Sequence, residues 1–265
     1  MRSTLVTTIA MGLCLTAATT LNACSTVPPG GNLAELQGLA ASCEPTHKPA
    51  TLVRADGSAT AQSDALREQY IAVARDKALA AAICGGTFRF DIFGASLTDS
   101  ITVASVSFDP IGATETAQLR SAAKRAQEVV DAIEDAYPDA LAKLSSNGTD
   151  VVSSLQAGRE FIDQINVNGP THSLSLVLLT DGLDNHSAPL DDPGLTTPQA
   201  QSYVGSIPVP DLAGASVSIF GVGRVSGTSQ LPSSHTDAVR AFYEALLART
   251  GATTVTIATD YTGGR

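Results

Sequence analysis

The sequence has few basic residues and, after its amino terminus, no apolar run long enough to span a membrane. Of its 265 residues only four are lysine, and the formal net charge is -10. A protein that binds nucleic acid through a basic face needs clustered Lys and Arg, so this composition argues against that class. A bilayer-spanning helix needs about 20 consecutive apolar residues. We therefore expect no nucleic-acid partner and no membrane-spanning domain.

Sequence patterns of common catalytic and metal sites are also missing. There is no G-x-S-x-G motif of the kind that carries a nucleophilic serine. The four histidines stand at positions 47, 172, 186 and 235, without the spacing of metal ligands, so we expect them on the surface. The carboxylates between positions 181 and 192 lack the spacing of an EF-hand, and we expect a solvated loop there. These absences favour a binding protein over an enzyme.

The amino terminus has the composition of a secretion signal. A short basic start precedes residues 5–21, which are apolar or small and uncharged. The segment ends in LNAC at 21–24, which resembles the lipobox of bacterial lipoproteins, where the cysteine becomes the lipidated first residue. This resemblance implies a signal peptide over residues 1–23 and a lipid anchor on Cys24, on the extracytoplasmic face of the cell membrane. Cleavage by the ordinary signal peptidase is the alternative, although Leu21 suits that enzyme poorly.

The remainder of the chain is long enough for one sizeable domain. Residues 24–48 begin with a Pro/Gly-rich stretch and are predicted to be a lipid-anchored tether with a short N-terminal segment. Residues 49–265 then form a single domain, since a chain of more than about 200 residues buries a core of its own. The lipid anchor is expected to be its only attachment to the membrane.

Within that domain, strand patterns alternate with helix patterns. Residues 174–179 have the almost unbroken apolar run of a central strand that is covered on both faces. The strands at 87–93 and 101–108 are joined by a short connection, which favours an antiparallel hairpin. This alternation predicts an α/β fold, a doubly wound, mostly parallel central sheet with one antiparallel edge strand and helices on both faces. The other predicted strands are 50–55, 215–222 and 253–258.

Helices are predicted from composition and apolar periodicity. Their segments are 64–82, 118–137, 150–165 and a stripe from Val239 to Leu247 that stops before Gly251. Pro138 is expected to break or restart the second of these helices. The segment from Asn185 to Pro210, with five prolines after Asn185, is expected to be either a recognition surface or a disordered insert.

Hydroxyl and carboxylate side chains cluster at the ends of predicted strands or turns. The clusters are Asp56, Ser58 and Thr60 after the first strand, Thr149 and Asp150 after an Asn-Gly turn, and Asp181 after the central strand. If the strands are parallel, all three clusters point out of the same edge of the sheet. Several oxygen donors would then converge. An oxygen-only nest of this kind selects a small divalent cation, Mg²⁺ or Mn²⁺.

Cys43 and Cys84 are the cysteines left to pair in the exported domain. Cys43 precedes the first predicted strand and Cys84 ends the first predicted helix, so in a β-α-β arrangement both lie at the sheet edge opposite the predicted metal site. A disulfide is therefore geometrically plausible, and exported proteins meet oxidising conditions. Two buried free thiols are the alternative.

The strand ends carry four segments in order: DGSAT at 56–60, NGTDVVSSL at 147–155, LVLLTDGLDN at 176–185 and VSIFGVG at 217–223. They resemble the signature segments of the von Willebrand factor type A (vWA) domain, a family with a metal-ion-dependent adhesion site (MIDAS). The first motif of that site is usually Asp-x-Ser-x-Ser. Here the last Ser position is taken by Thr60, whose β-branch restricts its rotamers. We expect this substitution to change how tightly a metal ion is bound rather than whether one is bound.

The resemblance implies a ligand set and a partner. Ser58, Thr60 and Thr149 would be oxygen ligands, while Asp56 and Asp181 would bind the ion directly or through water. Two carboxylates neutralise a divalent ion, whereas hydroxyls add coordination without charge, so the ion stays electrophilic toward an incoming anion. We therefore expect cation-dependent binding of a protein that presents an acidic side chain, and no catalysis.

Simpler interpretations of the same residues stay open. The first cluster could consist of turn and capping residues, Thr149 is a good N-cap for the helix after it, and Asp181 could belong to a simple turn. Two other functions also stay open. One is a metal-dependent hydrolase, for which only His186 stands near these motifs as a general base. The other is a metal-free structural domain.

Overall fold

The structure is a computed structural model that describes residues 32–145, 148–169, 171–226 and 231–263. Its strands are β1 (Lys48–Asp56), β2 (Thr87–Phe93), β3 (Ser100–Ser107), β4 (His172–Leu179), β5 (Ser216–Phe220) and β6 (Thr254–Ala258). Its helices are α1 (Leu33–Ala41), α2 (Asp64–Ile83), α3 (Glu115–Leu141), α4 (Ser153–Ile165), α5 (Thr197–Tyr203) and α6 (Ser233–Ala248), with 3-10 turns η1 (Ala59–Ala61) and η2 (Val204–Ser206).

The six strands form one sheet in the order β3-β2-β1-β4-β5-β6. Neighbouring strands are parallel except β2 and β3, which form an antiparallel hairpin at one edge. From β1 the chain moves outward in one direction, and from β4 it moves outward in the other. The sheet is therefore doubly wound, with its switch point between β1 and β4. The predicted fold class is confirmed.

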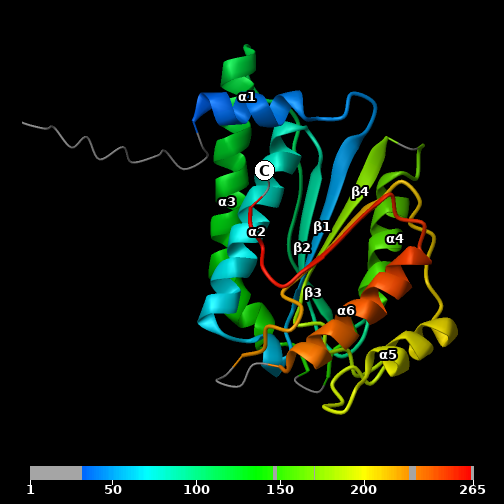
Figure 1. The fold of residues 1–265 in the computed structure, drawn as a ribbon. Helices are drawn as coiled ribbons and strands as arrows, with labels where there is room; N and C mark the ends of the chain where they lie inside the picture. Colours follow the sequence, from blue (N-terminus) through cyan, green and yellow to red (C-terminus); the bar gives the residue numbers. More distant parts are fainter. Residues whose placement is uncertain (1–31, 146–147, 170, 227–230, 264–265) are drawn as a thin grey trace, which may run out of the picture.

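Helices cover both faces of the sheet (Figure 1). On one face, α2 and α3 pack against an apolar cluster that includes Phe88 and Phe90 of β2. On the other face, side chains of α4, α5 and α6 share a cluster with Leu176 and Leu178 of β4. Alternate side chains of β4 enter the two clusters, because successive residues of a strand point to opposite faces. This two-sided burial explains the unbroken apolar run of the central strand.

One charged side chain, Arg54, is buried within the sheet two residues before the end of β1. It is 2 % exposed, its guanidinium lies 5.2 Å from the centre of the Phe93 ring, and it donates to Ser100 Oγ at 3.2 Å. Burial lowers the pKa of Arg54 to about 10, and the negative charge of Asp91 on β2 is the main opposing influence. These contacts join the end of β1 to the β2–β3 hairpin.

The prediction that Pro138 breaks its helix is wrong, because α3 continues to Leu141. Proline lacks one N–H and clashes with the preceding turn, a cost that matters most in a helix interior. Here it stands in the last turn, and its carbonyl still accepts the N–H of Ala142 at 3.0 Å. The next helix, α4, begins at Ser153 rather than at the predicted residue 150.

The segment between β4 and β5 is packed rather than disordered. Leu190, Leu195 and Val204 are buried and belong to the cluster that also holds α6. Within this segment α5 begins with a capping box between Thr196 and Gln199, which stabilises a short helix that the sequence did not predict. The alternative of a disordered insert is therefore wrong. Recognition by its outer surface stays a prediction.

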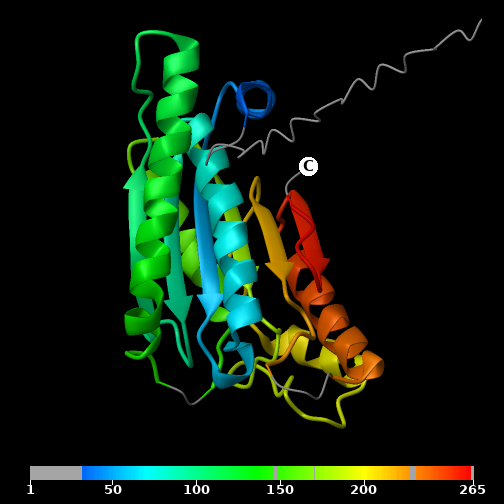
Figure 2. The same ribbon diagram turned by 90° about the vertical axis from the view of Figure 1, so that its left-hand side faces the viewer.

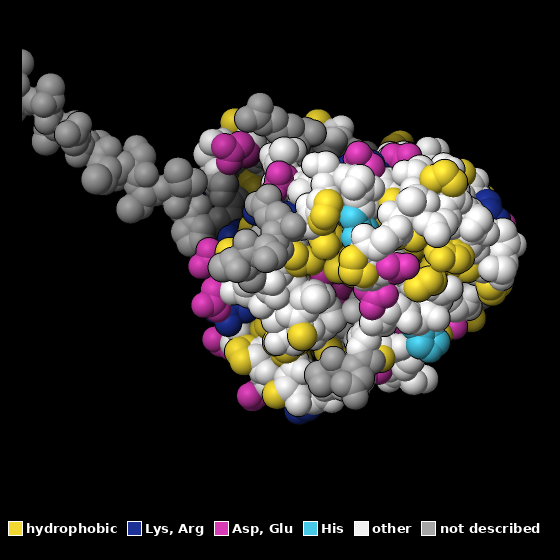
Figure 3. Space-filling model, turned by 60° about the horizontal axis from the view of Figure 1, so that its bottom comes forward, with side chains coloured by type: hydrophobic (Ala, Val, Ile, Leu, Met, Phe, Trp, Pro, Cys, Tyr) yellow, Lys and Arg dark blue, Asp and Glu magenta, His cyan; other side chains and the backbone are white. Residues whose placement is uncertain are grey.

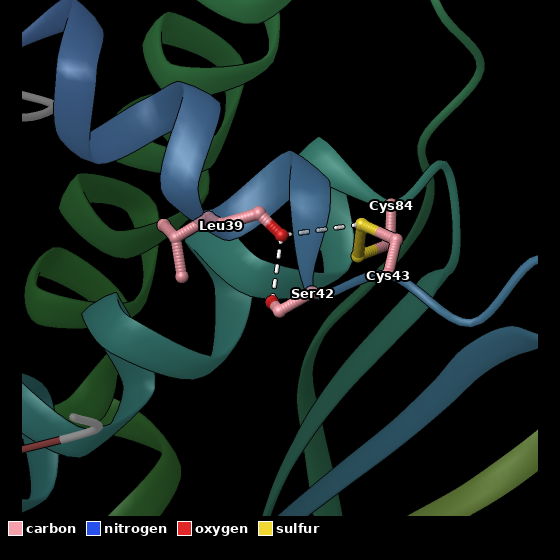
Figure 4. Close-up of a disulfide and its surroundings, with 4 residues drawn as sticks. All are labelled: Leu39, Ser42, Cys43 and Cys84. Carbon is pink, nitrogen blue, oxygen red and sulfur yellow. Dashed lines mark hydrogen bonds between the residues drawn. A yellow bond between two sulfur atoms is a disulfide. The ribbon is translucent and has the colours of Figure 1, made fainter.

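A disulfide joins Cys43, which follows α1, to Cys84, the C-cap of α2 (Figure 4). The Cα atoms of the two cysteines are 5.5 Å apart. The carbonyl of Leu39 accepts the hydroxyl of Ser42 at 2.7 Å and lies 3.5 Å from Cys43 Sγ, so the end of α1 is fixed by local contacts as well. The predicted pairing is confirmed.

Helix α1 lies at the end of the domain where the parallel strands begin, and the strands run away from it (Figure 2). Its Leu36 packs against Leu119 and Ala123 of α3, so part of the predicted N-terminal segment is a folded element. Residues 1–23 and Cys24, predicted to be the signal peptide and the lipid-bearing residue, lie outside the described residues. None of the helices in the described part has the length and hydrophobicity that crossing a membrane requires.

Candidate functional site

The candidate site lies at the edge of the sheet where the parallel strands end, on the opposite side of the domain from α1 (Figure 2). β1 ends at Asp56 and β4 ends at Leu179. The parallel register pairs Ala55 with Leu179, which puts Asp56 beside Thr180. This is the switch point of the sheet, where doubly wound proteins bind their ligands.

Asp56 is fully buried, and both of its carboxylate oxygens accept hydrogen bonds. Oδ1 accepts the backbone N–H of Ser58 at 2.8 Å, and Oδ2 accepts the hydroxyl of Thr180 at 2.7 Å. Gly57 lies between Asp56 and Ser58, where a Cβ would overlap the side chain of Leu144. A larger residue at this position would therefore displace the side chain of Leu144.

Ser58 and Thr60 place their hydroxyl oxygens 3.2 Å apart on the loop after β1. Ser58 is buried and Thr60 is exposed. Ser226, in the segment after β5, holds this loop by donating its N–H to the Thr60 carbonyl and its hydroxyl to the Ala59 carbonyl. The capping interpretation is wrong for Ser58, which makes no side-chain cap to η1, while α2 is capped by Ser63.

Asp181 is buried and has one carboxylate oxygen without a partner. Its Oδ1 accepts the N–H of Leu183 at 2.9 Å, whereas Oδ2 accepts no hydrogen bond from the residues that the structure describes. Gly182 has φ +84°, a conformation that favours glycine and lets the chain turn sharply after Asp181. A buried oxygen without a partner is rare, because its desolvation is not compensated. A simple turn does not account for Oδ2, which is available to an ion or a water molecule.

Thr149 lies at the same edge, in the segment before α4. Its N–H donates to Asn185 Oδ1 at 3.0 Å, and its carbonyl accepts the N–H of Asn185 at 3.2 Å, which ties it to the loop after β4. The N–H of Asp150 donates to the carbonyl of Gly94, directly after β2. Thr149 is not the N-cap of α4, because the helix begins at Ser153, whose N–H donates to Asp150 Oδ1. The capping interpretation of Thr149 is therefore wrong.

The two buried carboxylates affect each other. The pKa of Asp56 is raised to about 7, chiefly by burial and then by the negative charge of Asp181, against the hydrogen bonds from Thr180 and Ser58. Burial also raises the pKa of Asp181, while the N–H of Leu183 and the hydroxyl of Thr60 lower it. Two buried like charges favour uptake of a proton or a cation.

Tyr243 of α6 fixes the turn after Asp181 from the face of the sheet that α4, α5 and α6 cover. Its hydroxyl donates to the carbonyl of Gly182 at 3.0 Å. Burial raises the pKa of Tyr243 well above its usual value, and nearby negative charges raise it further. Those charges are, in decreasing order, Asp184, Asp181, Asp56 and Asp150. The ends of β1 and β4 and the segment before α4 therefore lie in one neighbourhood.

The prediction of a solvated acidic loop is wrong for Asp184, which is completely buried. Its carboxylate accepts the backbone N–H groups of Val152, His186, Ser187 and Ala188. Burial raises the pKa of Asp184, against these hydrogen bonds. Asp184 thus organises the loop after β4 and joins it to the start of α4.

The prediction that all four histidines lie on the surface is wrong for His235. The residue is 3 % exposed, and Nε2 lies 2.7 Å from the carbonyl of Leu190. His186 is exposed, and its Nδ1 lies 3.6 Å from Asp150 Oδ2. The first of these contacts anchors the loop after β4 to α6.

A pocket of about 700 Å³ lies beside the loop that carries Ser58 and Thr60, because Ser226, which holds that loop, is part of the pocket wall. Its wall includes Ser63 and Leu66 at the start of α2, Thr236 of α6, and Arg224, which lies 2.8 Å from Asp260. In Figure 3, with this edge of the domain brought forward, acidic and apolar side chains predominate over Lys and Arg. A partner at this edge would meet both the nest and the pocket.

The donor set suits a small, hard divalent cation, because carboxylate and hydroxyl oxygens are its preferred ligands. Among the described residues, no group of three or more His, Cys, Asp or Glu is placed to hold a metal ion. The predicted set is of another kind, since it has two carboxylates and three hydroxyls. The unpartnered Oδ2 of Asp181 and the mutual influence of Asp56 and Asp181 fit such an ion.

The sequence did not single out several residues that build this site. They are Thr180, Asn185, Ser226 and Tyr243, each of which acts through a contact between distant segments. Asn147, the first residue of the predicted Asn-Gly turn, lies outside the described residues. Neither a protein-family model nor a curated protein matches this sequence. The functional interpretation therefore depends on the chemistry of this chain itself.

Proposed function

We propose that this protein is a vWA-type domain that binds another protein through a divalent cation. The observation that carries the proposal is the pair of buried carboxylates at neighbouring strand ends. Asp56 has its pKa raised by burial and by Asp181, and Asp181 keeps one oxygen without a partner. A bound cation would compensate both charges and use that oxygen.

The residues of such a site would have different roles. Asp56 and Asp181 would supply negative charge, and Ser58, Thr60 and Thr149 would supply neutral oxygens. When bound, Mg²⁺ or Mn²⁺ would supply a positive charge that attracts an acidic side chain of the partner. The hydrogen bond from Thr180 to Asp56 and the clamp of Ser226 on the first loop keep the donors in place before the ion arrives. The wall of the adjoining pocket would contact the partner around its acidic residue.

We also propose that the protein is a lipoprotein, attached through Cys24 to the extracytoplasmic face of the cell membrane after removal of residues 1–23. Two observations support this location. The Cys43–Cys84 disulfide suits an oxidising compartment. The start of the described chain lies at the end of the domain opposite the candidate site (Figure 2). An anchor there leaves the site free to face a partner.

The binding proposal is tested by capture of partner proteins from the cell envelope on the immobilised full chain. Binding is expected with Mg²⁺ and is expected to be lost with EDTA or in Asp181→Ala. Asp192→Ala is the matched control, because it removes an exposed carboxylate from the same loop and should leave binding intact. Capture that is indifferent to both EDTA and Asp181→Ala would reject the proposal.

A metal-free structural domain is the second candidate, and one observation favours it. Both oxygens of Asp56 already accept hydrogen bonds within the protein, so this carboxylate is satisfied without an ion. Calorimetric titration of the full chain with Mg²⁺ and with Mn²⁺ separates the two candidates. Saturable binding of either ion supports the cation-dependent function, and no binding supports the structural domain.

A further inference from the structure

Tyr70 has a buried hydroxyl that no protein atom satisfies. It belongs to α2, its side chain is 1 % exposed, and its hydroxyl makes no hydrogen bond with the residues that the structure describes. The other side chains on this face of α2 are apolar, among them Leu66 and Val73. A phenylalanine would fill the same space without burying a polar atom. The hydroxyl therefore adds an unfavourable desolvation term that packing alone does not require.

The hydroxyl of Tyr70 lies in the neighbourhood of the candidate site. The side chain belongs to the same buried cluster as Ala55, next to the end of β1, and Leu179, the last residue of β4. Burial raises the pKa of Tyr70 well above its usual value, and the charge of Asp56 is the next largest cause. Asp181 acts on it as well. Tyr70 therefore belongs to the buried interior next to the ends of β1 and β4, where the charges of both carboxylates act on it.

Tyr70 and Asp181 each have a buried polar atom without a hydrogen-bond partner among the described residues, one a donor and the other an acceptor. The phenol hydroxyl is a donor without an acceptor, and Asp181 Oδ2 is an acceptor without a donor. They do not bond to each other, and a single group within reach of both would satisfy both. Buried waters typically make about three hydrogen bonds to groups that are otherwise unsatisfied. A water molecule can accept from the hydroxyl, donate to the carboxylate and keep a lone pair for a cation.

We propose that Tyr70 is a positioning residue of the cation site, donating its hydroxyl to a water molecule that also binds Asp181 Oδ2 and hydrates the ion. The inference rests on the proposed function. It adds a residue from the core side of the site, far in sequence from the metal-binding segments. It also gives the tyrosine two opposite effects, because the hydroxyl is unfavourable in the cation-free protein and favourable in the loaded protein.

The test is Tyr70→Phe in the full chain, which removes one oxygen and keeps the ring. Calorimetric titration is expected to give a Mg²⁺ dissociation constant about tenfold higher than that of the native protein, the size of one hydrogen bond in a charged site. In EDTA, the melting temperature of the variant is expected to equal or exceed the native value. A residue that only packed the core would not produce opposite changes in affinity and stability.

Tyr203→Phe is the matched control. Tyr203 of α5 is partly buried against the apolar cluster on the other face of the sheet, away from α2. Its hydroxyl should not affect Mg²⁺ affinity. An unchanged Mg²⁺ affinity in Tyr70→Phe, or a lower melting temperature in EDTA, overturns the role of Tyr70 while the proposed function stands. If the native protein itself binds neither Mg²⁺ nor Mn²⁺, the proposed function fails first.

Discussion

The two ends of this domain are stabilised in different ways. Where the strands begin, α1 packs Leu36 into an apolar contact with α3, and the Cys43–Cys84 disulfide adds a covalent link. Where the strands end, the buried groups include carboxylates, hydroxyls and backbone amides, and Oδ2 of Asp181 has no hydrogen-bond partner among the described residues. Oδ2 of Asp91 in β2 is also unpartnered among these residues, but the charge of that residue is paired with Arg89 at 2.7 Å. At the first end, contacts within the protein account for the buried groups. At the second end, they leave a buried carboxylate oxygen without a hydrogen-bond partner among the described residues, which is typical of a surface that binds something.

The same contrast exists within the loop after β4, between two aspartates three positions apart. Asp184 is completely buried and accepts four backbone N–H groups. Asp181 is equally buried and accepts one. Burial of a carboxylate is therefore not evidence of function by itself. The number of hydrogen bonds to each oxygen distinguishes a residue that supports the loop from one that is available to a ligand.

The largest effect is expected from Asp184→Ala. Removal of this carboxylate leaves the buried N–H groups of Val152 and Ala188 without an acceptor, and the free energy of unfolding should fall by about 4 kcal/mol or more. Asp181→Ala is the comparison, because it removes a buried charge that accepts a single backbone N–H and it removes the repulsion between Asp181 and Asp56. In EDTA its stability should lie within about 1 kcal/mol of the native value.

Denaturant unfolding of both variants in EDTA measures this difference. Equal losses of stability in Asp181→Ala and Asp184→Ala would show that Asp181 supports the loop in the same way as Asp184. In that case the unpartnered oxygen would carry no functional meaning.

The next largest effect is expected at the other end of the domain. The double variant Cys43→Ser/Cys84→Ser opens a loop whose ends are 41 positions apart. In the chain-entropy model this lowers the free energy of unfolding by roughly 3 to 4 kcal/mol. Because the disulfide is remote from the candidate site, Mg²⁺ affinity under folding conditions should not change. A change in Mg²⁺ affinity would show that the two ends are coupled.

A smaller effect is expected from pH in the cation-free protein. The pKa of Asp56 is raised from 3.8 to about 7, so the folded state binds more protons than the unfolded state between these values. Stability from this group is present below the unfolded pKa and is lost as the pH rises through the folded pKa. Between about pH 5 and about pH 8, the free energy of unfolding in EDTA should fall by roughly 2 to 3 kcal/mol.

Thermal unfolding in EDTA and in Mg²⁺ over this pH range measures the effect. Mg²⁺ should reduce the loss, because a cation stabilises the ionised carboxylates that form as the pH rises. Equal stability at both ends of the range in EDTA would contradict the raised pKa of Asp56. An identical pH dependence with and without Mg²⁺ would contradict cation binding at this pair.

Much of the fold was predictable because strong local patterns agree with the tertiary structure. The apolar run of β4 and the apolar stripe of α6 are long enough to predict a strand and a helix whatever the neighbouring segments suggest. The elements that were missed are short. α1 and α5 have few apolar positions, and they are stabilised by packing of Leu36 and of Ala200 on distant elements. Pro138 was misjudged because the position of a proline within a helix depends on where the helix ends.

The candidate site was predictable only as a list of oxygen donors at strand ends. That list placed Asp56, Ser58, Thr60, Thr149 and Asp181 at one edge, since parallel strands end together. It could not separate Asp181 from Asp184, because both are aspartates after the same strand. Their difference is the number of backbone N–H groups that reach each carboxylate, and those groups come from α4 and from the loop itself.

The sequence by itself determined the alternation of strands and helices, the shared edge of the polar clusters and the pair of cysteines that form the disulfide. These follow from periodicity and from chain order, which are local or nearly local properties. Only the tertiary structure decided that Oδ2 of Asp181 has no partner among the described residues and that Thr180 donates a hydrogen bond to Asp56. Those outcomes depend on hydrogen bonds between segments as much as 124 positions apart, and a linear pattern carries no information about which of them form.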